Sequence, residues 1–155
     1  MPRQSAGLLI FRERNGELQV LLAHPGGPFW TRRDDGAWTI PKGEIGAGEE
    51  PLGAAHREVG EELGWIPEGE TLPLTTITQK GGKIVSAWAV EGDWDPATLR
   101  SDTFELESPR GSGRIQRYPE VDRAAWFPLE QARTKILAAQ VPLLDELERL
   151  WTARS

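Results

Sequence analysis

The segment Gly43 to Trp65, with the sequence GEIGAGEEPLGAAHREVGEELGW, constrains the fold of this chain more than any other stretch. It begins as a glycine-rich loop and continues into Pro51, whose fixed φ and missing N–H suit the first turn of a helix. Gly64 supplies a stop, because glycine readily adopts the left-handed conformation that ends many helices. The segment therefore predicts a loop followed by a helix over residues 51–63.

Three glutamates share one side of this expected helix. Glu58, Glu61 and Glu62 are spaced i, i+3 and i+4, so their side chains project in the same direction. Like charges this close repel one another, which indicates that a cation is held among them; a solvated acidic face is the simpler alternative. The apolar arc of the helix lies beside these acids rather than opposite them, and it contains Leu52, Ala55, Val59 and Leu63. We therefore expect the acids at the margin of the buried face.

The composition limits the partners of such a site. With 155 residues, 38% of them hydrophobic, the chain is expected to form a single domain over residues 1–155. Its formal net charge of -6 argues against a stable nucleic-acid or membrane partner. Cysteine is absent and histidine occurs only twice, so carboxylates must supply any metal site, which favours Mg²⁺ or Mn²⁺ over zinc. The apolar run near the amino terminus is too short for a signal peptide or a membrane span, so a cytoplasmic location is expected.

Apolar runs separated by turn residues predict a sheet. The expected strands cover residues 6–11, 18–23, 37–40, 71–79, 84–90 and 121–127, with hairpin turns at residues 15–16 and 80–83. Helices are expected over residues 51–63, 129–138 and 142–151. This order of elements predicts an α/β or α+β sandwich in which helices flank a mixed sheet.

Two loops are expected to carry binding residues. Phe29 to Gly36 follows a run of Pro and Gly, contains Arg32 and Arg33, and should be mobile. Glu91 to Pro119 is rich in Gly, Pro, Ser, Asp and Arg and shows little periodicity. Because this stretch is too long for an idle connection, we expect a functional loop with a short helical turn near residues 96–99.

The spacing within Gly43 to Trp65 resembles a known family signature. Gly43 is followed after five residues by Glu49, and after seven more by the run Arg57 to Trp65, REVGEELGW. This resembles the Nudix hydrolase signature G-x5-E-x7-R-E-U-x-E-E-x-G-U, in which U is a bulky apolar residue, and only Trp65 departs softly from it. The resemblance implies the Nudix α/β/α sandwich. It also implies hydrolysis of a nucleoside diphosphate linked to another group, assisted by Mg²⁺ or Mn²⁺.

The resemblance also implies roles for single residues. Glu58, Glu61 and Glu62 match the acids that ligate the metal, and Gly43 lies where the loop backbone approaches it. Glu49 and Arg57 match the positions that orient the helix. In some members of the family the residue at the position of Glu49 also lies near the metals. A metal-bound water then serves as the nucleophile near neutral pH, and electrostatics carry most of the catalysis.

The general base is left open by the resemblance. In the family it is either a glutamate of the signature or an acid from a later loop, so the candidates here are Glu62, Glu105, Glu107 and Glu120. Among the later acids Glu120 is favoured, because it directly precedes the expected strand over residues 121–127. For Glu105 and Glu107 a plain surface role is the preferred interpretation.

Cationic and aromatic residues near the signature are candidates for substrate binding. Lys42 directly precedes it and is placed to meet a phosphate oxygen. Stacking on a nucleobase is assigned to Trp30 and Tyr118, and further loop cations that can reach the same site are Arg32, Arg33, Lys80 and Lys83. Trp38 is expected to pack under the signature segment. Core packing is expected for Trp88, Trp126 and Trp151, and no site role for His24 and His56.

The stretch WTIPKGEIGAGEEP and the Arg-rich loop after it resemble most the diadenosine tetraphosphate hydrolase branch of the family. The leading expectation is therefore a Mg²⁺-dependent hydrolase of dinucleoside polyphosphates. Alternative substrates are nucleoside triphosphates, ADP-ribose and the 5′ end of RNA. A non-catalytic nucleotide-sensing module is the alternative of another class, and such a module is expected to lack one or more of the acids. A small-molecule nucleotide is the expected partner, and the sequence leaves the oligomeric state open, a monomer or a homodimer included.

Overall fold

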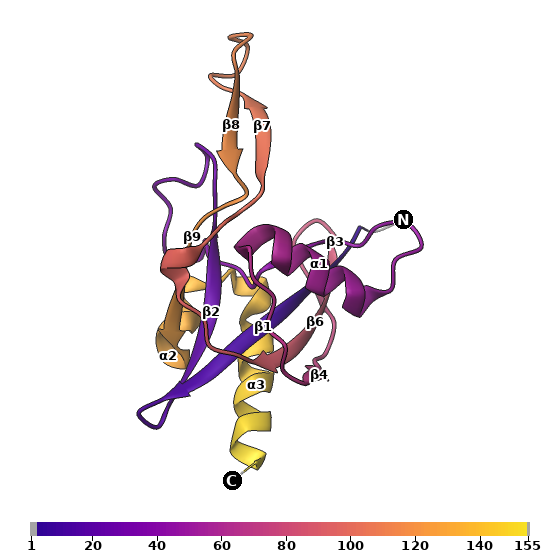
Figure 1. The fold of residues 1–155 in the computed structure, drawn as a ribbon, viewed down its shortest axis with the longest axis vertical. Coiled ribbons are helices and arrows are strands. Elements are labelled where there is room, and N and C mark those ends of the chain that lie inside the picture. Colours follow the sequence, from indigo (N-terminus) through magenta and orange to yellow (C-terminus); the bar gives the residue numbers. More distant parts are fainter. Residues whose placement is uncertain (1–2, 155) are drawn as a thin grey trace.

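The computed structural model describes residues 3–154 as a seven-stranded mixed sheet with helices on both of its faces (Figure 1). The strands of this sheet are β1 (Gln4–Arg14), β2 (Glu17–Pro25), β3 (Lys42–Glu44), β4 (Thr71–Pro73), β5 (Ile77–Thr78), β6 (Ile84–Glu91) and β9 (Val121–Pro128). The helices are α1 (Pro51–Leu63), α2 (Leu129–Lys135) and α3 (Val141–Ala153), with 3-10 turns at Pro96–Thr98 and Ala138–Gln140. Among residues 3–154, none of the helices has both the length and the apolar character that crossing a membrane requires.

Strand β1 organises the sheet. The strand order is β4-β6-β1-β2-β9, and β1 runs antiparallel to β2 and β3 but parallel to β6. Because side chains alternate along a strand, Leu8 and Ile10 face α1 whereas Leu9 and Phe11 face α2 and α3. Both faces are covered, which explains why β1 is an unbroken apolar run rather than an alternating one. The predicted α/β/α sandwich is confirmed.

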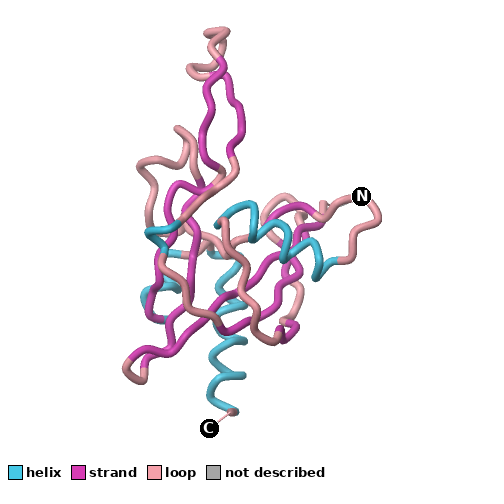
Figure 2. The backbone as a smooth tube through the Cα atoms, in the orientation of Figure 1, coloured by secondary structure: helices cyan, strands magenta, loops and turns pink. Residues whose placement is uncertain are grey.

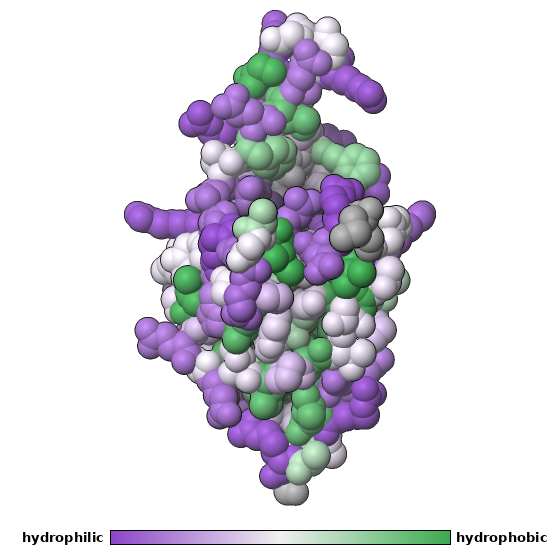
Figure 3. All heavy atoms as spheres, turned by 90° about the vertical axis from the view of Figure 1, so that its right-hand side faces the viewer, coloured by the Kyte–Doolittle hydropathy of each residue, from purple (hydrophilic) through white to green (hydrophobic). Residues whose placement is uncertain are grey.

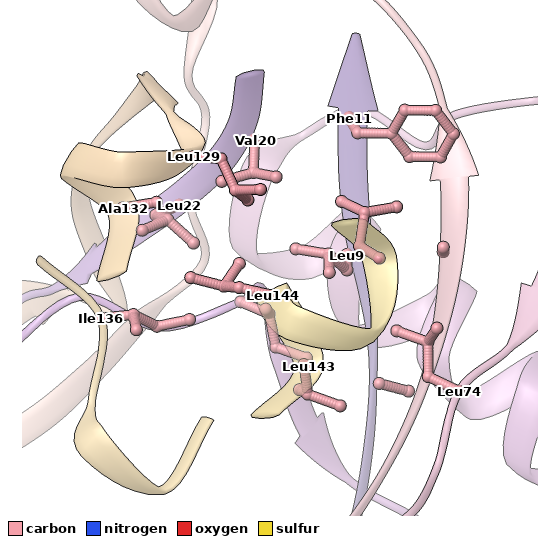
Figure 4. Close-up of a cluster of buried hydrophobic side chains, with 14 of the residues drawn as sticks. Leu9, Phe11, Val20, Leu22, Leu74, Leu129, Ala132, Ile136, Leu143 and Leu144 are labelled. Carbon is pink, nitrogen blue, oxygen red and sulfur yellow. The ribbon is translucent and has the colours of Figure 1, made fainter. Parts of the chain in front are cut away.

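The face of the sheet opposite α1 carries the larger of two hydrophobic clusters. Leu9 of β1, Leu22 of β2 and Leu144 of α3 meet there, and all three are fully buried (Figure 4). The tube view shows α3 running along this side of the strands (Figure 2). Burial of leucine side chains of this kind contributes about 2 kcal/mol each to folding, so the sandwich is held from both sides.

Helix α1 has the predicted bounds, because its ends are specified locally. The Glu50 side chain caps the amino terminus by accepting hydrogen bonds from the backbone N–H groups of Leu52 and Gly53. Gly64 ends the helix in the left-handed conformation, with φ of 77°, and its N–H donates to the carbonyl oxygen of Gly60. The buried residues of the helix are Ala54, Ala55, Val59 and Leu63.

Two glycine substitutions test this description of α1. A Cβ on Gly64 would lie 2.7 Å from the Cβ and the carbonyl oxygen of Arg100, on a backbone that L-residues rarely adopt. Gly64→Ala is therefore expected to lower the free energy of unfolding by about 2 kcal/mol. Gly53 lies within the helix with only Glu50 Oε1 nearby at 3.7 Å, so Gly53→Ala is expected to raise it by about 0.8 kcal/mol. Urea unfolding checks both, and equal signs for the two variants would contradict the assignment.

Some predicted bounds differ from the structure. Residues 37–40 form no strand and make only the isolated bridges Ala23 to Thr39 and Trp38 to Ile136. Regular pairing with the sheet begins at β3, which pairs with β1. The predicted strand over residues 71–79 is divided into β4 and β5, which both pair with β6. The helix predicted over residues 129–138 ends at Lys135, because Ile136 is extended and bridges to Trp38.

The stretch Glu91 to Pro119 is more regular than predicted. The turn at Pro96–Thr98 is present, but strands β7 (Thr103–Glu107) and β8 (Ile115–Pro119) form a separate antiparallel hairpin that projects from the body (Figures 1 and 2). The space-filling view shows a mixture of hydrophobic and hydrophilic side chains on this projection (Figure 3). Both of its faces meet solvent, and Leu106 and Ile115 are exposed. Strand β7 does alternate polar with apolar residues, Thr-Phe-Glu-Leu-Glu, which is a strand signal that the sequence interpretation overlooked, whereas β8 shows no such alternation.

Candidate active site

The loop before α1 and the helix itself fit together through Gly43. A Cβ on Gly43 would overlap the carboxylate of Glu58, so only glycine lets this carboxylate lie against the backbone of β3. The backbone N–H of Lys42, the preceding residue, donates to Glu62 Oε1 at 3.0 Å. Glu58 and Glu62 are thereby turned toward β3, at the margin of the buried face of α1 where the sequence predicted them.

Arg57 forms ion pairs with Glu49 in the loop and with Glu58 and Glu61 on the helix. Its Nε and Nη2 donate to the two oxygens of Glu49 at 2.7 and 2.9 Å. Its Nη1 donates to Glu58 at 2.9 Å and to Glu61 at 2.7 Å. The Arg57 guanidinium, with help from the Gly46 N–H, lowers the pKa of the Glu49 carboxyl to about 2. Glu49 and Arg57 therefore connect the loop to the helix, which is the orienting role implied by the resemblance.

Burial is the main influence on the ionisation of three acids of the site, namely Glu62, Glu120 and also Glu58. Burial raises the pKa of the Glu62 carboxyl, and the charges of Glu120 and Glu58 raise it further. Burial also raises the pKa of Glu120, followed by the charge of Glu58, and burial is the main cause of the raised pKa of Glu58. Burial and the neighbouring Lys83 amine lower the pKa of Lys42. Three carboxylates that resist ionisation together are a place where an added cation would be stabilised.

The donor set fits a divalent metal ion of the hard class. All candidate ligands are carboxylate or backbone oxygens, which are the ligands that Mg²⁺ and Mn²⁺ prefer. Within residues 3–154, no three acidic or histidine side chains already surround a common point. In this arrangement Arg57 holds one carboxylate oxygen each of Glu58 and Glu61.

A cavity of about 280 Å³ adjoins these acids and collects residues from distant parts of the chain. It is lined by Lys42 and Glu62 beside the signature loop, by Glu120 before β9 and by Trp30 from the loop after β2, together with Thr39 and Gln79. Four of the predicted site residues therefore meet here. A larger cavity of about 470 Å³ lies at the other end of β1, but it contains none of them, and its Arg12 is paired with Asp93 at 2.8 Å.

Other predicted substrate residues do not line this cavity. The ring of Tyr118 packs at the base of the hairpin against Phe104, with ring centroids 6.0 Å apart, and its hydroxyl donates to Gln116. Arg32 is exposed in the loop after β2, and Lys80 is exposed in the turn between β5 and β6. Substrate contact by these three residues remains a prediction.

The two later acids Glu105 and Glu107 lie on β7. Glu105 faces Arg117 across the hairpin at 3.8 Å. Glu107 accepts hydrogen bonds from the backbone N–H groups of Gly111 and Gly113 at 2.8 and 3.0 Å, which stabilises the hairpin loop. Neither acid lines the cavity, so Glu120 is the later acid that the geometry favours as a base.

His24 has a structural function that the sequence did not reveal. It is fully buried, with Nδ1 2.9 Å from Asp122 Oδ1 and Nε2 2.6 Å from the carbonyl oxygen of Arg33. The loop that carries Trp30 is thereby fastened to β9, and Asp34 adds an ion pair of 2.7 Å with Lys135. The loop Phe29 to Gly36, which was predicted to be mobile, is thus held in place at Arg33 and Asp34. An isolated histidine in a strand gives no sequence signal for such a contact.

The tryptophans are distributed over both faces of the sheet. Trp38 does not pack under the signature segment as predicted; it lies on the opposite face, in edge contact with Phe127 at 5.0 Å. The Trp38 side chain points to the face of the sheet opposite α1, and its Nε1 donates a hydrogen bond to Asp34. The core packing expected for three tryptophans is confirmed in part, because all three are partly buried and pack against the core, Trp88 and Trp126 on the α1 side and Trp151 on the α3 side. Trp65 stacks on Trp94 at 5.4 Å.

The fold and the site together define a class of α/β/α proteins with a glycine loop and a glutamate-bearing helix at one end of a mixed sheet. The NUDIX domain family matches residues 1–147 of the chain. The chain belongs to this family, as the spacing of its acids predicted.

Curated relatives agree with this membership. An RNA pyrophosphohydrolase of Halorhodospira halophila is 30% identical over 120 residues, which cover 66% of this chain and 62% of that protein. An RNA pyrophosphohydrolase of Acinetobacter baylyi is 29% identical over 124 residues, covering 72% of this chain and 74% of that protein. The chain thus spans less than two thirds of the length of the first of these relatives.

Solved structures extend the similarity over nearly the whole chain. A binary complex of the Ap4A hydrolase of C. elegans is 27% identical with a TM-score of 0.63, covering 97% of this chain and 98% of that one. The NUDIX domain of NrtR from Shewanella oneidensis, solved with ADP ribose, is 17% identical with a TM-score of 0.68, covering 97% and 89%. The second likeness shows the fold alone.

Proposed function

We propose that this protein is a divalent-metal-dependent hydrolase that cleaves a phosphoanhydride bond in a nucleoside diphosphate joined to another group, with dinucleoside polyphosphates as its preferred substrates. The observation that carries the proposal is the cavity in which Trp30, Lys42, Glu62 and Glu120 meet beside the signature acids. It offers an aromatic ring for a base, a cation for phosphate and carboxylates for a metal within one space. The similarity to the Ap4A hydrolase of C. elegans over nearly the full length supports the substrate class.

Glu58, Glu61 and Glu62 are the proposed metal ligands, with the backbone of Gly43 close by. When bound, Mg²⁺ or Mn²⁺ would neutralise phosphate charge and acidify a water molecule. Lys42, which is half-buried and lines the cavity, holds a phosphate oxygen as a point charge. Arg57 and Glu49 keep the helix and loop in register, so they act on the ligands rather than on the substrate.

Glu120 is the proposed proton acceptor, with Glu62 as the alternative. Glu120 lines the cavity and lies at the start of β9, whereas Glu62 is also held by the backbone N–H of Lys42. A base that is not a metal ligand can be removed without a large loss of metal affinity. Glu120→Gln is therefore expected to lower kcat by about a hundredfold while leaving Mg²⁺ affinity within about threefold. Stopped-flow turnover and magnesium calorimetry check the two parts, and an equal loss of metal affinity would assign Glu120 as a ligand instead.

The 5′ end of RNA is a second candidate substrate. The observation in its favour is the name of the relatives in Halorhodospira halophila and Acinetobacter baylyi, both RNA pyrophosphohydrolases. The formal net charge of -6 acts against it, because long RNA backbones are repelled by an acidic surface. Short triphosphorylated oligonucleotides at several salt concentrations separate the charge effect from the preference for the end group.

A chromatographic screen tests the proposed function. Purified protein with Mg²⁺ is offered diadenosine polyphosphates, nucleoside triphosphates, ADP-ribose, nucleotide sugars and 5′-triphosphorylated oligonucleotides, with a chelator and with Glu61→Gln as controls. The expected result is cleavage of diadenosine polyphosphates that both controls abolish. Metal-dependent binding without cleavage of any compound would identify a nucleotide sensor and overturn the proposal. Glu68→Gln, an exposed acid outside the site, is the matched variant that should retain full activity.

A further inference from the structure

Gln140, at the start of α3, is a fully buried polar side chain in the layer below the cavity. The backbone N–H of Ile40 donates to its Oε1 at 3.0 Å. A backbone N–H can only donate, so the amide atom facing Ile40 must be the oxygen, whichever way the amide is drawn. The nitrogen of Gln140 must then point the other way.

Gln79 receives that nitrogen. Gln140 Nε2 donates a hydrogen bond to Gln79 Oε1 at 2.8 Å, so the side-chain oxygen of Gln79 already has a partner inside the protein. The backbone of Gln79 is held as well, because its N–H donates to the carbonyl of Lys83 at 2.7 Å and its carbonyl accepts from Gly82 at 3.0 Å. The chain of contacts from Ile40 thus fixes which end of the Gln79 amide is free.

The free end of Gln79 is a hydrogen-bond donor. Gln79 lines the same cavity as Trp30, Lys42 and Glu62. Within residues 3–154, its Nε2 has no hydrogen-bond partner, and it is not among the buried atoms without one, so it is accessible to solvent. Thr39, another lining residue, donates its hydroxyl proton to the carbonyl of Ile40 at 2.9 Å and so presents only lone pairs. The wall therefore offers a fixed donor and a fixed acceptor.

We propose that Gln79 determines base specificity by donating its amide N–H to an acceptor nitrogen of the substrate's purine ring, and that Gln140 is the positioning residue that keeps the donor facing the cavity. This inference rests on the proposed function. A neutral amide adds little to a phosphate that Lys42 and Lys83 already attract, whereas a base stacked on Trp30 needs an in-plane partner of this kind. Because the Gln79 oxygen accepts a hydrogen bond from Gln140, Gln79 can present only its N–H groups to a substrate.

Deaza analogues test the donor directly. In each of the 1-, 3- and 7-deaza forms of a diadenosine polyphosphate, one acceptor nitrogen of adenine is replaced by C–H. The wild type is expected to lose at least about tenfold in kcat/KM with one of the three and little with the other two. Gln79→Met removes the donor at similar volume, so it should process that analogue and the parent compound equally well.

Gln79→Glu tests the polarity of the contact. Glutamate keeps the bond from Gln140 Nε2 but presents an oxygen to the cavity, so kcat/KM for the parent compound should fall below that of Gln79→Met. Gln140→Met should reduce the ratio of kcat/KM between the parent compound and the discriminated deaza analogue when Gln79 is present. In the Gln79→Met variant the same substitution should leave this ratio unchanged, because Gln140 acts through Gln79. A loss of stability alone would not produce this pattern. Gln131→Met, at an exposed position on α2, is the matched control.

The outcomes separate the two claims. If no nucleotide is cleaved and none binds with Mg²⁺, the proposed function fails, and the assignment of Gln79 with it. If diadenosine polyphosphates are cleaved but all three analogues are processed equally, or Gln79→Met keeps the discrimination, only the assignment of Gln79 fails. A uniform loss across all four compounds in Gln79→Met would indicate contact with phosphate or ribose and would likewise overturn it.

Discussion

Replacing Glu62 with glutamine is expected to lower kcat by at least about a hundredfold while making the metal-free protein more stable. Glutamine keeps the oxygen that accepts from the Lys42 N–H at 3.0 Å, so the loop before α1 stays in place. The charge that would hold a metal is lost, which removes activity. The same change relieves the desolvation that raises the pKa of this carboxyl.

The gain in stability can be measured in the presence of a chelator. We expect the Tm of Glu62→Gln to rise by about 3 °C, the shift that about 1 kcal/mol produces in a domain of this size. With excess Mg²⁺ the order should reverse, because the wild type binds the ion and the variant does not. Glu68→Gln, at an exposed position, controls for the loss of one negative charge and should change neither property. Unaltered turnover in Glu62→Gln would remove Glu62 from the site.

The pH dependence of the metal-free protein follows from the same carboxyl. Its pKa in the folded state is raised above the unfolded value, so between these two values the folded state holds more protons than the unfolded state. The free energy of unfolding must therefore decrease as the pH rises above about 5. Glu62→Gln should flatten this slope but not abolish it, because the pKa values of Glu58 and Glu120 are raised as well. Urea titrations at several pH values check the sign.

Gly43→Ala is expected to lower activity by about a hundredfold with little change in Tm. The added Cβ overlaps both the carboxylate and the Cγ of Glu58, so this side chain must rotate about its Cα–Cβ bond, which a flexible, partly exposed side chain can do without a shift of the backbone. The fold therefore survives, but a proposed metal ligand leaves its place against the loop. Turnover and magnesium calorimetry should show a parallel loss, and wild-type metal affinity in this variant would contradict the role given to Glu58.

Two comparisons isolate the cause of the Gly43 effect. In Glu58→Ala the clashing carboxylate is absent, so adding Gly43→Ala to it should cost little further activity. Gly7→Ala has the opposite profile, because its Cβ would lie 2.5 Å from the carbonyl oxygen of Pro41, and backbone cannot rotate away. That variant should lose stability by several kcal/mol, whereas Gly43→Ala should not.

The parts of the fold that were predictable are those specified by neighbouring residues. Helix α1 was predicted to the residue because Pro51 and Gly64 mark its ends within the local sequence. The hairpin of β1 and β2 was predicted because Asn15 and Gly16, with φ of 55° and 77°, form the turn that their sequence favours. The end of α2 was missed because it depends on the bridge between Ile136 and Trp38, which are far apart in the chain.

The candidate site divides in the same way. The spacing of Glu58, Glu61 and Glu62 is a local property, and it identified the acidic helix. The contacts that shape the cavity join residues separated by 61 positions for Gln79 and Gln140 and by 98 for His24 and Asp122. Nothing in a single sequence marks such pairs, because glutamine and histidine are compatible with strands and loops anywhere on a surface.

The projecting hairpin has a further consequence, because its two ends meet. The N–H of Glu120 donates to the carbonyl of Asp102 at 2.8 Å, and the N–H of Asp102 donates to the carbonyl of Glu61 on α1 at 2.8 Å. Residues 103–119 therefore leave and re-enter the body at one clasped point. Lengthening or shortening such an excursion costs only about 0.6 kcal/mol per doubling in closure entropy. A change of length within residues 103–119 is therefore expected to alter the projection with little effect on the free energy of unfolding or on the acidic helix.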